Sequence, residues 1–260
     1  MNDNTGRNSI RLSPLVAHRG WASRFPENTL PAVNAALSSG AAYVEIDIQI
    51  TKDGIPVLLH DVTLDRTTTQ CGMIHDLNWH DLADCDAGEP ARFGRRFQHT
   101  TLPTLYEFIE LVSTWPDVTA FVEIKEESLA HFGIENVADS IIEIIRPLAP
   151  RVIPISYNSE FLSNLRNRHQ VKRTGWVMHE YNDDSLDIAA QLAPDFLFCN
   201  YRKIKGPPKQ GPWRWVCYEI ASVELALNLL EQGIGLIETM AIGDLISDPL
   251  WLSTWSANNE

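Results

Sequence analysis

The chain has 260 residues, of which 44% are hydrophobic and 21% are charged, and its formal net charge at pH 7 is -13. This composition is typical of a globular protein with a sizeable core, organised as one large α/β domain or as two small ones. The strong negative charge argues against a nucleic acid or an anionic membrane as the main partner, but a local cation can still attract a phosphate-bearing substrate.

The chain opens with the polar stretch MNDNTGRNSIRLSP, which contains no apolar core of signal-peptide length. No later apolar run is long enough to span a bilayer, so no stable membrane insertion is expected. The four cysteines show neither metal-ligand spacing nor the pattern of a disulfide framework. These features favour a cytoplasmic protein with reduced thiols, and they specify no oligomeric state.

Eight apolar segments typical of strands alternate along the chain with segments typical of helices. The predicted strands are 15–18, 43–50, 120–125, 152–157, 174–178, 195–200, 213–220 and 235–239. Apolar residues recur at three- and four-residue spacing in the predicted helices, which are 28–40, 104–115, 135–148, 159–170, 185–193 and 222–233. Eight strands alternating with helices over about 250 residues predict a (β/α)8 barrel of the TIM type.

Two segments depart from this alternation. Residues 61–103 are polar and too long for an ordinary connector, so we interpret them as a small insertion after the second strand of a single barrel domain spanning 1–260. Residues 201–212 contain no plausible helix, so the sixth helix should be short or missing. A doubly wound open sheet is the alternative fold, but no glycine-rich phosphate loop follows the first strand.

Within the insertion, the stretch HDLNWHDLADCD (75–86) gathers histidines and aspartates. A second metal site is one interpretation of this cluster. We favour a short helix that buries Leu77, Trp79 and Leu82 and leaves its charged residues in solvent, because charge clusters usually form the wet face of a helix.

The second predicted strand, YVEIDIQI, carries Glu45 and Asp47 two residues apart. Residues at i and i+2 point to one face of a strand, and the intervening residues form an aliphatic stripe on the other face. In a parallel sheet covered by helices both faces are buried, so the stripe should face the helices and the two carboxylates should face the barrel interior. Two carboxylates there repel each other unless a metal or a proton intervenes.

The next strand repeats the design, because in FVEIK both Glu123 and Lys125 face inwards. Three carboxylates on neighbouring strands predict a hard-oxygen site for a divalent metal ion, Mg²⁺ or Ca²⁺, with Mn²⁺ as a further candidate. A salt-bridged barrel interior is the structural alternative.

His18 and Arg19 end the first strand, at the edge where barrels of this type carry their active sites. A hairpin turn at Asp53-Gly54 returns the chain after the second strand and delivers His60. A metal flanked by two imidazoles, an arginine and a lysine suits phosphodiester cleavage. The basic side chains offset phosphate charge, one histidine removes a proton from the attacking hydroxyl, and the other protonates the departing alkoxide.

Several short motifs accompany these residues: HRG, PENT, ExD, DG, HD and LDRTT, followed by LPTLYEFIELV and FVEIK. Together they resemble the glycerophosphodiester phosphodiesterase family. The resemblance implies a (β/α)8 barrel with a small insertion after the second strand, and metal-dependent hydrolysis of a small-molecule glycerophosphodiester to glycerol 3-phosphate and an alcohol. By position it also implies roles for seven residues: His18 and His60 as the acid–base pair, Glu45, Asp47 and Glu123 as metal ligands, and Arg19 and Lys125 as phosphate-binding residues.

The resemblance weakens after residue 125. The family usually shows Trp-Thr-Val-Asn near the seventh strand, where this chain has YEIA (218–221), and Gly235 and Met240 stand where acidic residues are common. These differences lie on the side expected to contact the alcohol. Two other functions are therefore alternatives to glycerophosphodiester hydrolysis. One is that of a phosphodiesterase or phospholipase D-like lyase acting on another head group, and the other is that of a barrel that binds phosphodiesters without cleaving them.

Overall fold

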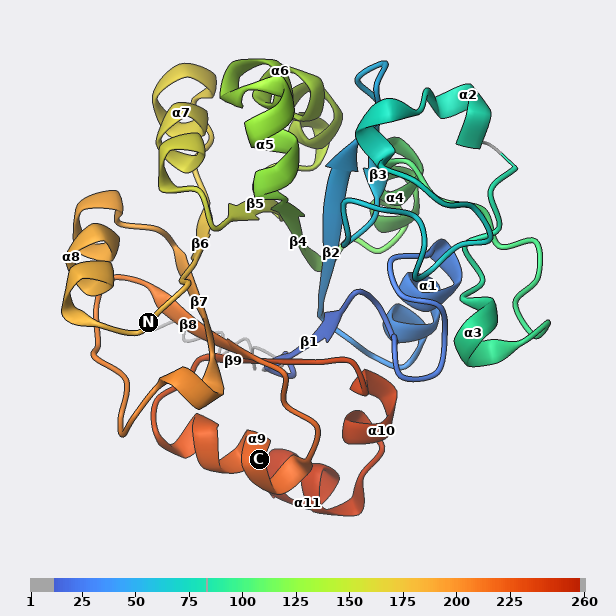
Figure 1. The fold of residues 1–260 in the computed structure, drawn as a ribbon. Coiled ribbons are helices and arrows are strands. Elements are labelled where there is room, and N and C mark those ends of the chain that lie inside the picture. The colour runs from blue at the N-terminus through green and yellow to red at the C-terminus, as the bar shows by residue number, and fades with distance from the viewer. Residues whose placement is uncertain (1–11, 83, 258–260) are drawn as a thin grey trace, which may run out of the picture.

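The computed structural model describes residues 12–82 and 84–257. Its strands form one sheet in the order β1-β9-β8-β7-β6-β5-β4-β2-β3, and β1 also pairs with β2, so the sheet closes on itself (Figure 1). All pairs within the ring are parallel. The strands of the ring are β1 (Leu15–His18), β2 (Tyr43–Ile50), β4 (Thr119–Ile124), β5 (Val152–Ser156), β6 (Gly175–Val177), β7 (Phe196–Asn200), β8 (Arg214–Tyr218) and β9 (Leu236–Thr239).

Closure of the ring confirms the predicted (β/α)8 barrel and excludes the open sheet. The short strand β3 (Pro56–Leu58) pairs antiparallel with the end of β2, as expected from the hairpin turn. Helices surround the ring on its outside (Figure 1). Six of them match the predicted helices: α1 (Leu30–Ser38), α4 (Leu105–Ser113), α6 (Ile134–Ile145), α7 (Ser159–His169), α8 (Asp183–Leu192) and α9 (Val223–Glu231).

Polar residues at the starts of these helices supply hydrogen-bond acceptors for the free backbone N–H groups. The side chains of Asn158 and Ser222 accept from the first turns of α7 and α9. Thr104 and Glu107 form a reciprocal capping box at the start of α4. These caps explain why the sequence pattern located the helix starts within about two residues.

Other helices were not predicted. They are α5 (Glu126–Phe132), α10 (Ile242–Ile246) and α11 (Pro249–Ala257), whereas the single-turn η2 (Arg146–Leu148) extends α6 to the end of the predicted helix 135–148. After β7 the structure has a single 3₁₀ turn, η3 (Tyr201–Lys203), and no α-helix before β8. The prediction that the sixth helix is short or missing is therefore confirmed.

The segment 61–103 forms a small insertion with an apolar cluster of its own. It contains η1 (Ile74–Asp76), α2 (Trp79–Leu82) and α3 (Pro90–Phe93). Leu82 is buried there, as predicted, but Leu77 and Trp79 are only half-buried and Leu77 lies outside α2. The expectation that the charged residues face solvent is wrong for His75. The His75 ring is buried because its Nε2 lies 3.2 Å from Gln49 Oε1 and 3.1 Å from Ser128 Oγ, which satisfy its polarity.

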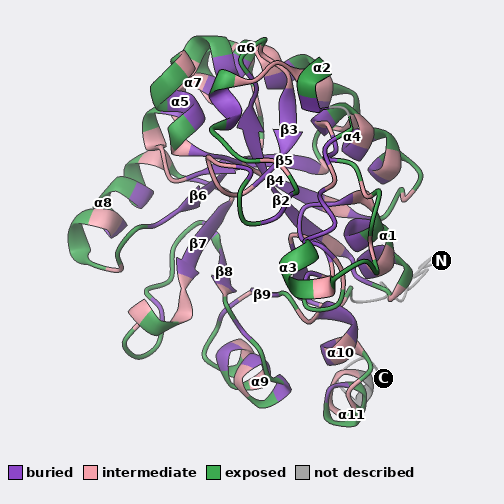
Figure 2. Ribbon diagram, turned by 45° about the vertical axis from the view of Figure 1, so that its right-hand side comes forward, coloured by how far each residue is buried: buried purple, intermediate pink, exposed green. Residues whose placement is uncertain are grey.

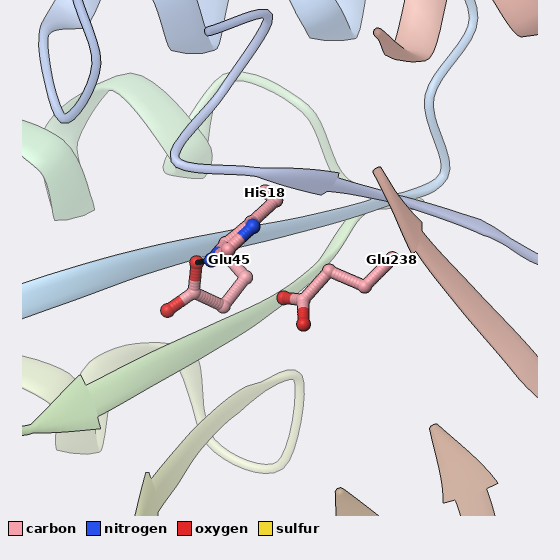
Figure 3. A group of neighbouring side chains, drawn as sticks. All are labelled: His18, Glu45 and Glu238. Carbon is pink, nitrogen blue, oxygen red and sulfur yellow. Dashed lines mark ion pairs between the residues drawn. The ribbon is translucent and has the colours of Figure 1, made fainter. Parts of the chain in front are cut away.

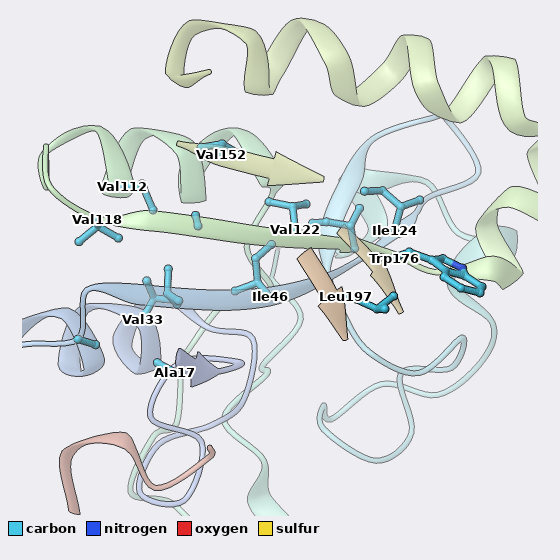
Figure 4. Packing of buried hydrophobic residues seen from close by; sticks show 14 of the residues in the cluster. Ala17, Val33, Ile46, Val112, Val118, Val122, Ile124, Val152, Trp176 and Leu197 are labelled. Carbon is cyan, nitrogen blue, oxygen red and sulfur yellow. The ribbon is translucent and has the colours of Figure 1, made fainter. Parts of the chain in front are cut away.

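Apolar side chains fill two layers, one between the ring and the helices and one inside the ring. Alternate residues of β2 and β4, such as Ile46 and Val122, pack outwards against the helices (Figure 4). Val16, Phe121 and Leu236 belong to the cluster inside the ring. The strands of the ring are mostly buried, and exposed residues gather on the outer helices (Figure 2). The inner cluster forms an apolar floor beneath the carboxyl ends of the strands.

No helix among the described residues is long and apolar enough to cross a membrane. Residues 1–11, on which most of the signal-peptide argument was based, lie outside the described part of the chain.

Candidate active site

A cavity of about 140 Å³ opens at the carboxyl ends of the barrel strands. Six of the seven residues predicted to form the site line it directly, and aromatic and acidic residues from the ends of later strands surround them. Its lining comprises His18, Arg19, Glu45, His60, Glu123, Lys125, Ile155, Tyr157, Val177, Phe198, Tyr218, Glu219 and Glu238. The seventh predicted residue, Asp47, lies behind this wall and contacts Arg19 and Lys125.

Strand register brings the polar residues together. His18 pairs with Glu45 across β1 and β2, and Asp47 pairs with Glu123 across β2 and β4. His18, Glu45 and Glu123 each lie two positions beyond a residue of the apolar floor or its rim, and Asp47 lies two positions beyond Glu45, so all four share the inward face. The expectation that the carboxylates of β2 and β4 face inwards is confirmed: Glu45 and Asp47 are each only 1% exposed.

Asp47 is the most heavily paired carboxylate of the site. Asn28 donates from Nδ2 to Asp47 Oδ2 at 2.9 Å and accepts from the Asp47 backbone N–H at 3.0 Å. Arg19 Nε lies 3.0 Å from Oδ2, and Lys125 Nζ lies 3.3 Å from Oδ1. Burial would raise the pKa of Asp47, but Arg19 and Lys125 outweigh it and hold this pKa well below its usual range. Asp47 is therefore a fixed negative charge.

Lys125 joins the two strands that carry the acids. It donates from Nζ to Glu123 Oε1 at 2.7 Å as well as to Asp47. Burial alone would lower the pKa of Lys125, but the two carboxylates raise it above its usual range, so the ammonium group stays charged. Burial raises the pKa of Glu123, against the attraction of Lys125.

Glu45 differs from Asp47 and Glu123 because, among the described residues, its carboxylate forms no ion pair with an arginine or a lysine. Its Oε2 accepts a backbone N–H from Arg19 at 3.3 Å and lies 3.8 Å from His18 Nε2, while its buried Oε1 has no hydrogen-bond partner. Burial, followed by repulsion from Asp47 and Glu238, raises the pKa of Glu45 well above its usual range. Such an unpaired buried oxygen is costly unless a cation or a proton occupies the space beside it.

The donor atoms fit a divalent metal ion. One oxygen from each of Glu45, Asp47 and Glu123 lies within 4.8 Å of the others. A second group with the same spacing contains His18, Glu45 and Glu238, which come from β1, β2 and β9 (Figure 3). The first group consists of oxygen donors alone, which suits hard cations such as Mg²⁺ and Ca²⁺.

His18 is 9% exposed, and its Nδ1 is buried without a hydrogen-bond partner. Burial, reinforced by the positive charge of Arg19, lowers the pKa of His18 to about 3. The ring is therefore neutral at pH 7, with one nitrogen protonated and the other free to accept a proton.

His60 is more exposed and is oriented by a chain of ion pairs. Its Nδ1 lies 2.7 Å from Asp61 Oδ1, and Arg66 donates from Nε to the other Asp61 oxygen at 2.6 Å. The hydrogen bond from Arg66, opposed by partial burial, lowers the pKa of Asp61 to about 2. Because the ionised Asp61 can only accept, Nδ1 carries a proton and Nε2 of the neutral ring carries the lone pair.

Glu27 links this chain to the first strand. Its carboxylate accepts from Arg66 and from Arg19 Nη1, the latter at 2.8 Å, and its backbone N–H donates to Glu89 of the insertion at 2.6 Å. Glu27 and Asn28 thus orient the loop after β1. The insertion positions the site through Arg66 and Glu89.

Gly20 allows this loop to turn. Its φ is +79°, and a Cβ there would lie 2.6–2.8 Å from backbone atoms of Ala32 and Val33. We expect Gly20→Ala to lower the free energy of unfolding by about 2–4 kcal/mol, from backbone strain and overpacking. Urea denaturation would measure this. Gly40 has φ +97° but open space around it, so Gly40→Ala should cost only about 1 kcal/mol, and equal losses in the two variants would contradict the packing argument.

The wall opposite the first strands is aromatic. Tyr157 and Tyr218 line the cavity, and their hydroxyl oxygens are 3.0 Å apart. Glu219, beside them at the mouth, has φ +66° and forms an ion pair of 3.1 Å with Arg202. Tyr218 therefore contributes an aromatic ring to this wall of the cavity.

The structure brings all seven predicted residues into one site, but Arg19 and Lys125 contact carboxylates, which was the structural alternative for them. Glu238 was missed. Its signal was present in GLIET, because Glu238 lies two positions after Leu236 and so shares the inward face.

Comparisons with known proteins agree with this arrangement. The model of the Glycerophosphoryl diester phosphodiesterase family matches residues 18–204. A glycerophosphodiester phosphodiesterase of Caldanaerobacter subterraneus subsp. tengcongensis is 37% identical over 154 residues, which are 58% of this chain and 61% of that protein. One from Bacillus altitudinis is 34% identical over 147 residues, 56% of this chain and 59% of that protein. The matches thus span about three-fifths of these relatives.

Solved structures resemble the whole barrel. An Oleispira antarctica phosphodiesterase in complex with the product sn-glycerol-3-phosphate has a TM-score of 0.82 and 27% identity, covering 91% of this chain and 96% of that one. A putative glycerophosphoryl diester phosphodiesterase from Silicibacter pomeroyi has a TM-score of 0.80 at 18% identity, covering 95% of each chain, and so supports the fold alone.

Proposed function

We propose that this chain, which belongs to the glycerophosphoryl diester phosphodiesterase family, hydrolyses a small glycerophosphodiester to glycerol 3-phosphate and an alcohol. The observation that carries the proposal is the convergence of three inward carboxylates on one point, beside His18 and His60. The product bound by the Oleispira antarctica relative supports the choice of substrate class.

The proposed cofactor is a divalent metal ion, held by Glu45, Asp47 and Glu123. Mg²⁺ and Ca²⁺ fit the all-oxygen donor set best, and Mn²⁺ is a further candidate. Its chemistry would be that of a Lewis acid, offsetting phosphate charge and lowering the pKa of a bound hydroxyl group. Such a charge would also stabilise the buried, unpartnered Oε1 of Glu45.

Arg19 and Lys125 would bind the phosphate. Both line the cavity while their charges are anchored by Asp47, so a phosphate oxygen can approach them without their moving far. The guanidinium group of Arg19 has five N–H donors, so some stay available for a phosphate after its contacts with Glu27 and Asp47. Together they would hold the diester in one orientation.

His18 and His60 would move the protons. Burial keeps the His18 ring neutral, and Asp61 fixes the orientation of the His60 ring through its hydrogen bond to Nδ1. One histidine takes the proton of the attacking hydroxyl, and the other gives a proton to the oxygen that leaves. The attacking hydroxyl is that of water, or that of the glycerol moiety when the reaction passes through a cyclic phosphate, and both routes need the same two transfers.

The test is incubation with a panel of glycerophosphodiesters and Mg²⁺, Mn²⁺ or Ca²⁺, followed by phosphorus NMR. Release of glycerol 3-phosphate supports the proposal. A cyclic phosphate as the end product would instead identify a phospholipase D-like lyase, for which the altered β8 residues Tyr218 and Glu219 are the structural argument. Tight binding without any product would identify a barrel that binds phosphodiesters without cleaving them.

A cytoplasmic location stays a prediction from the sequence.

A further inference from the structure

Glu238 is a buried acid of the site for which the function proposed above assigns no role. It lies on β9, which closes the barrel against β1, and its register partner on β1 is Val16, two residues before His18. Its side chain therefore projects into the same layer as His18 and Glu45 (Figure 3). Glu238 is only 3% exposed, so water compensates little of its charge.

The surroundings of Glu238 supply no basic partner. Among the described residues, neither of its oxygens takes part in a hydrogen bond or an ion pair, and Oε1 is fully enclosed. By contrast, Asp47 and Glu123 each contact Lys125 directly. Burial, with repulsion from Glu123 and Asp47, raises the pKa of Glu238 well above its usual range. A buried carboxyl group without a partner is destabilising and indicates that something else binds there.

The acidic groups of the site outnumber the basic groups that contact them. Four carboxylates converge here, from Glu45, Asp47, Glu123 and Glu238, whereas the basic groups that contact them are Arg19 and Lys125. The charge of Arg19 is in addition shared with Glu27. A divalent cation would fit where Glu45 and Glu238 both have an enclosed, unpartnered oxygen.

We propose that Glu238 is a cation ligand of this site, acting with Glu45 on the side that faces His18 and β9. The inference rests on the divalent-cation dependence proposed above and adds a fourth carboxylate to it. Glu45 belongs to both groups of closely spaced donors, so it is the residue through which Glu238 joins the centre. Mg²⁺ and Ca²⁺ take six or more oxygen ligands, which leaves room for a further carboxylate.

The test is Mn²⁺ binding to the full-length chain without substrate, measured by isothermal titration calorimetry and by the electron paramagnetic resonance of free Mn²⁺. We expect Glu238→Gln to weaken Mn²⁺ binding at least about tenfold, or to remove one ion where the wild type binds two. Either result supports the assignment, and the second would further show that Glu45 is shared by two ions. Glu238→Asp, which keeps the charge but shortens the side chain, should give a smaller loss.

Glu224→Gln is the matched control, because Glu224 is an exposed acid on α9 and its loss changes the net charge equally. Far-UV circular dichroism and the urea midpoint would establish that each variant is folded. Glu238→Gln and Glu238→Asp variants that bind Mn²⁺ with wild-type affinity and stoichiometry would overturn this inference alone. A wild-type chain that binds no divalent cation would overturn the proposed cofactor as well, so the two failures are distinguishable.

Discussion

Removal of divalent cations should abolish the release of glycerol 3-phosphate, and adding Mg²⁺, Mn²⁺ or Ca²⁺ back should restore it. The physical reason is the uncompensated charge around Glu45, which in the absence of a cation would repel the phosphate rather than bind it. Lewis-acid stabilisation contributes several kcal/mol, so the rate should fall on the order of 10³-fold. Exhaustive dialysis against EDTA, followed by an assay with each ion, would measure this.

A folded but inactive protein after dialysis is the informative result. The hydrophobic clusters of the barrel do not depend on the site, so the far-UV circular dichroism spectrum should be unchanged. The ion that restores the highest rate at the lowest concentration would be the best candidate for the physiological cofactor. Full activity after chelation would refute the assignment of Glu45, Asp47 and Glu123 as ligands.

The barrel could be predicted from the sequence because its signals are local. Alternation within β2 and the spacing of apolar residues in α7 each depend on neighbours a few positions away. The helices that were missed have weaker local signals. α5 and α10 are only seven and five residues long, and α11 carries exposed Leu250 and Leu252 as well as buried Trp251, so its apolar residues do not form one stripe.

Site residues that lie together in one strand or motif, such as Glu45 and Asp47, could be predicted from the sequence. Residues whose role depends on tertiary pairing were not predictable in the same way. Glu238 reaches the site because β9 pairs with β1, which lies more than 200 positions earlier in the chain. His75 is buried because Gln49 and Ser128 meet its ring from other segments. The pattern of GLIET indicates that Glu238 faces inwards but not that it lies beside His18 and Glu45, and no local pattern indicates that His75 is buried.

His18→Ala and His60→Ala should each lower kcat by about 10²–10⁴-fold while leaving the barrel folded, because a positioned acid or base contributes that much to proton transfer. Initial rates with a glycerophosphodiester at saturating metal would measure the loss. His80→Ala is the matched control, since the His80 side chain is 77% exposed on α2 and should not affect the rate. Mn²⁺ binding by His60→Ala should equal that of the wild type, because His60 belongs to neither group of closely spaced donors.

A substrate with a good leaving group would separate the two roles. A p-nitrophenyl ester of glycerol 3-phosphate releases a stable phenolate, which needs little protonation as it departs. The variant that lacks the general acid should therefore regain most of its rate with this ester, whereas the variant that lacks the general base should stay slow. The variant that stays slow with this ester therefore identifies the general base, and the variant that recovers identifies the general acid. Near-normal rates for either variant with the natural type of substrate would remove that histidine from the mechanism.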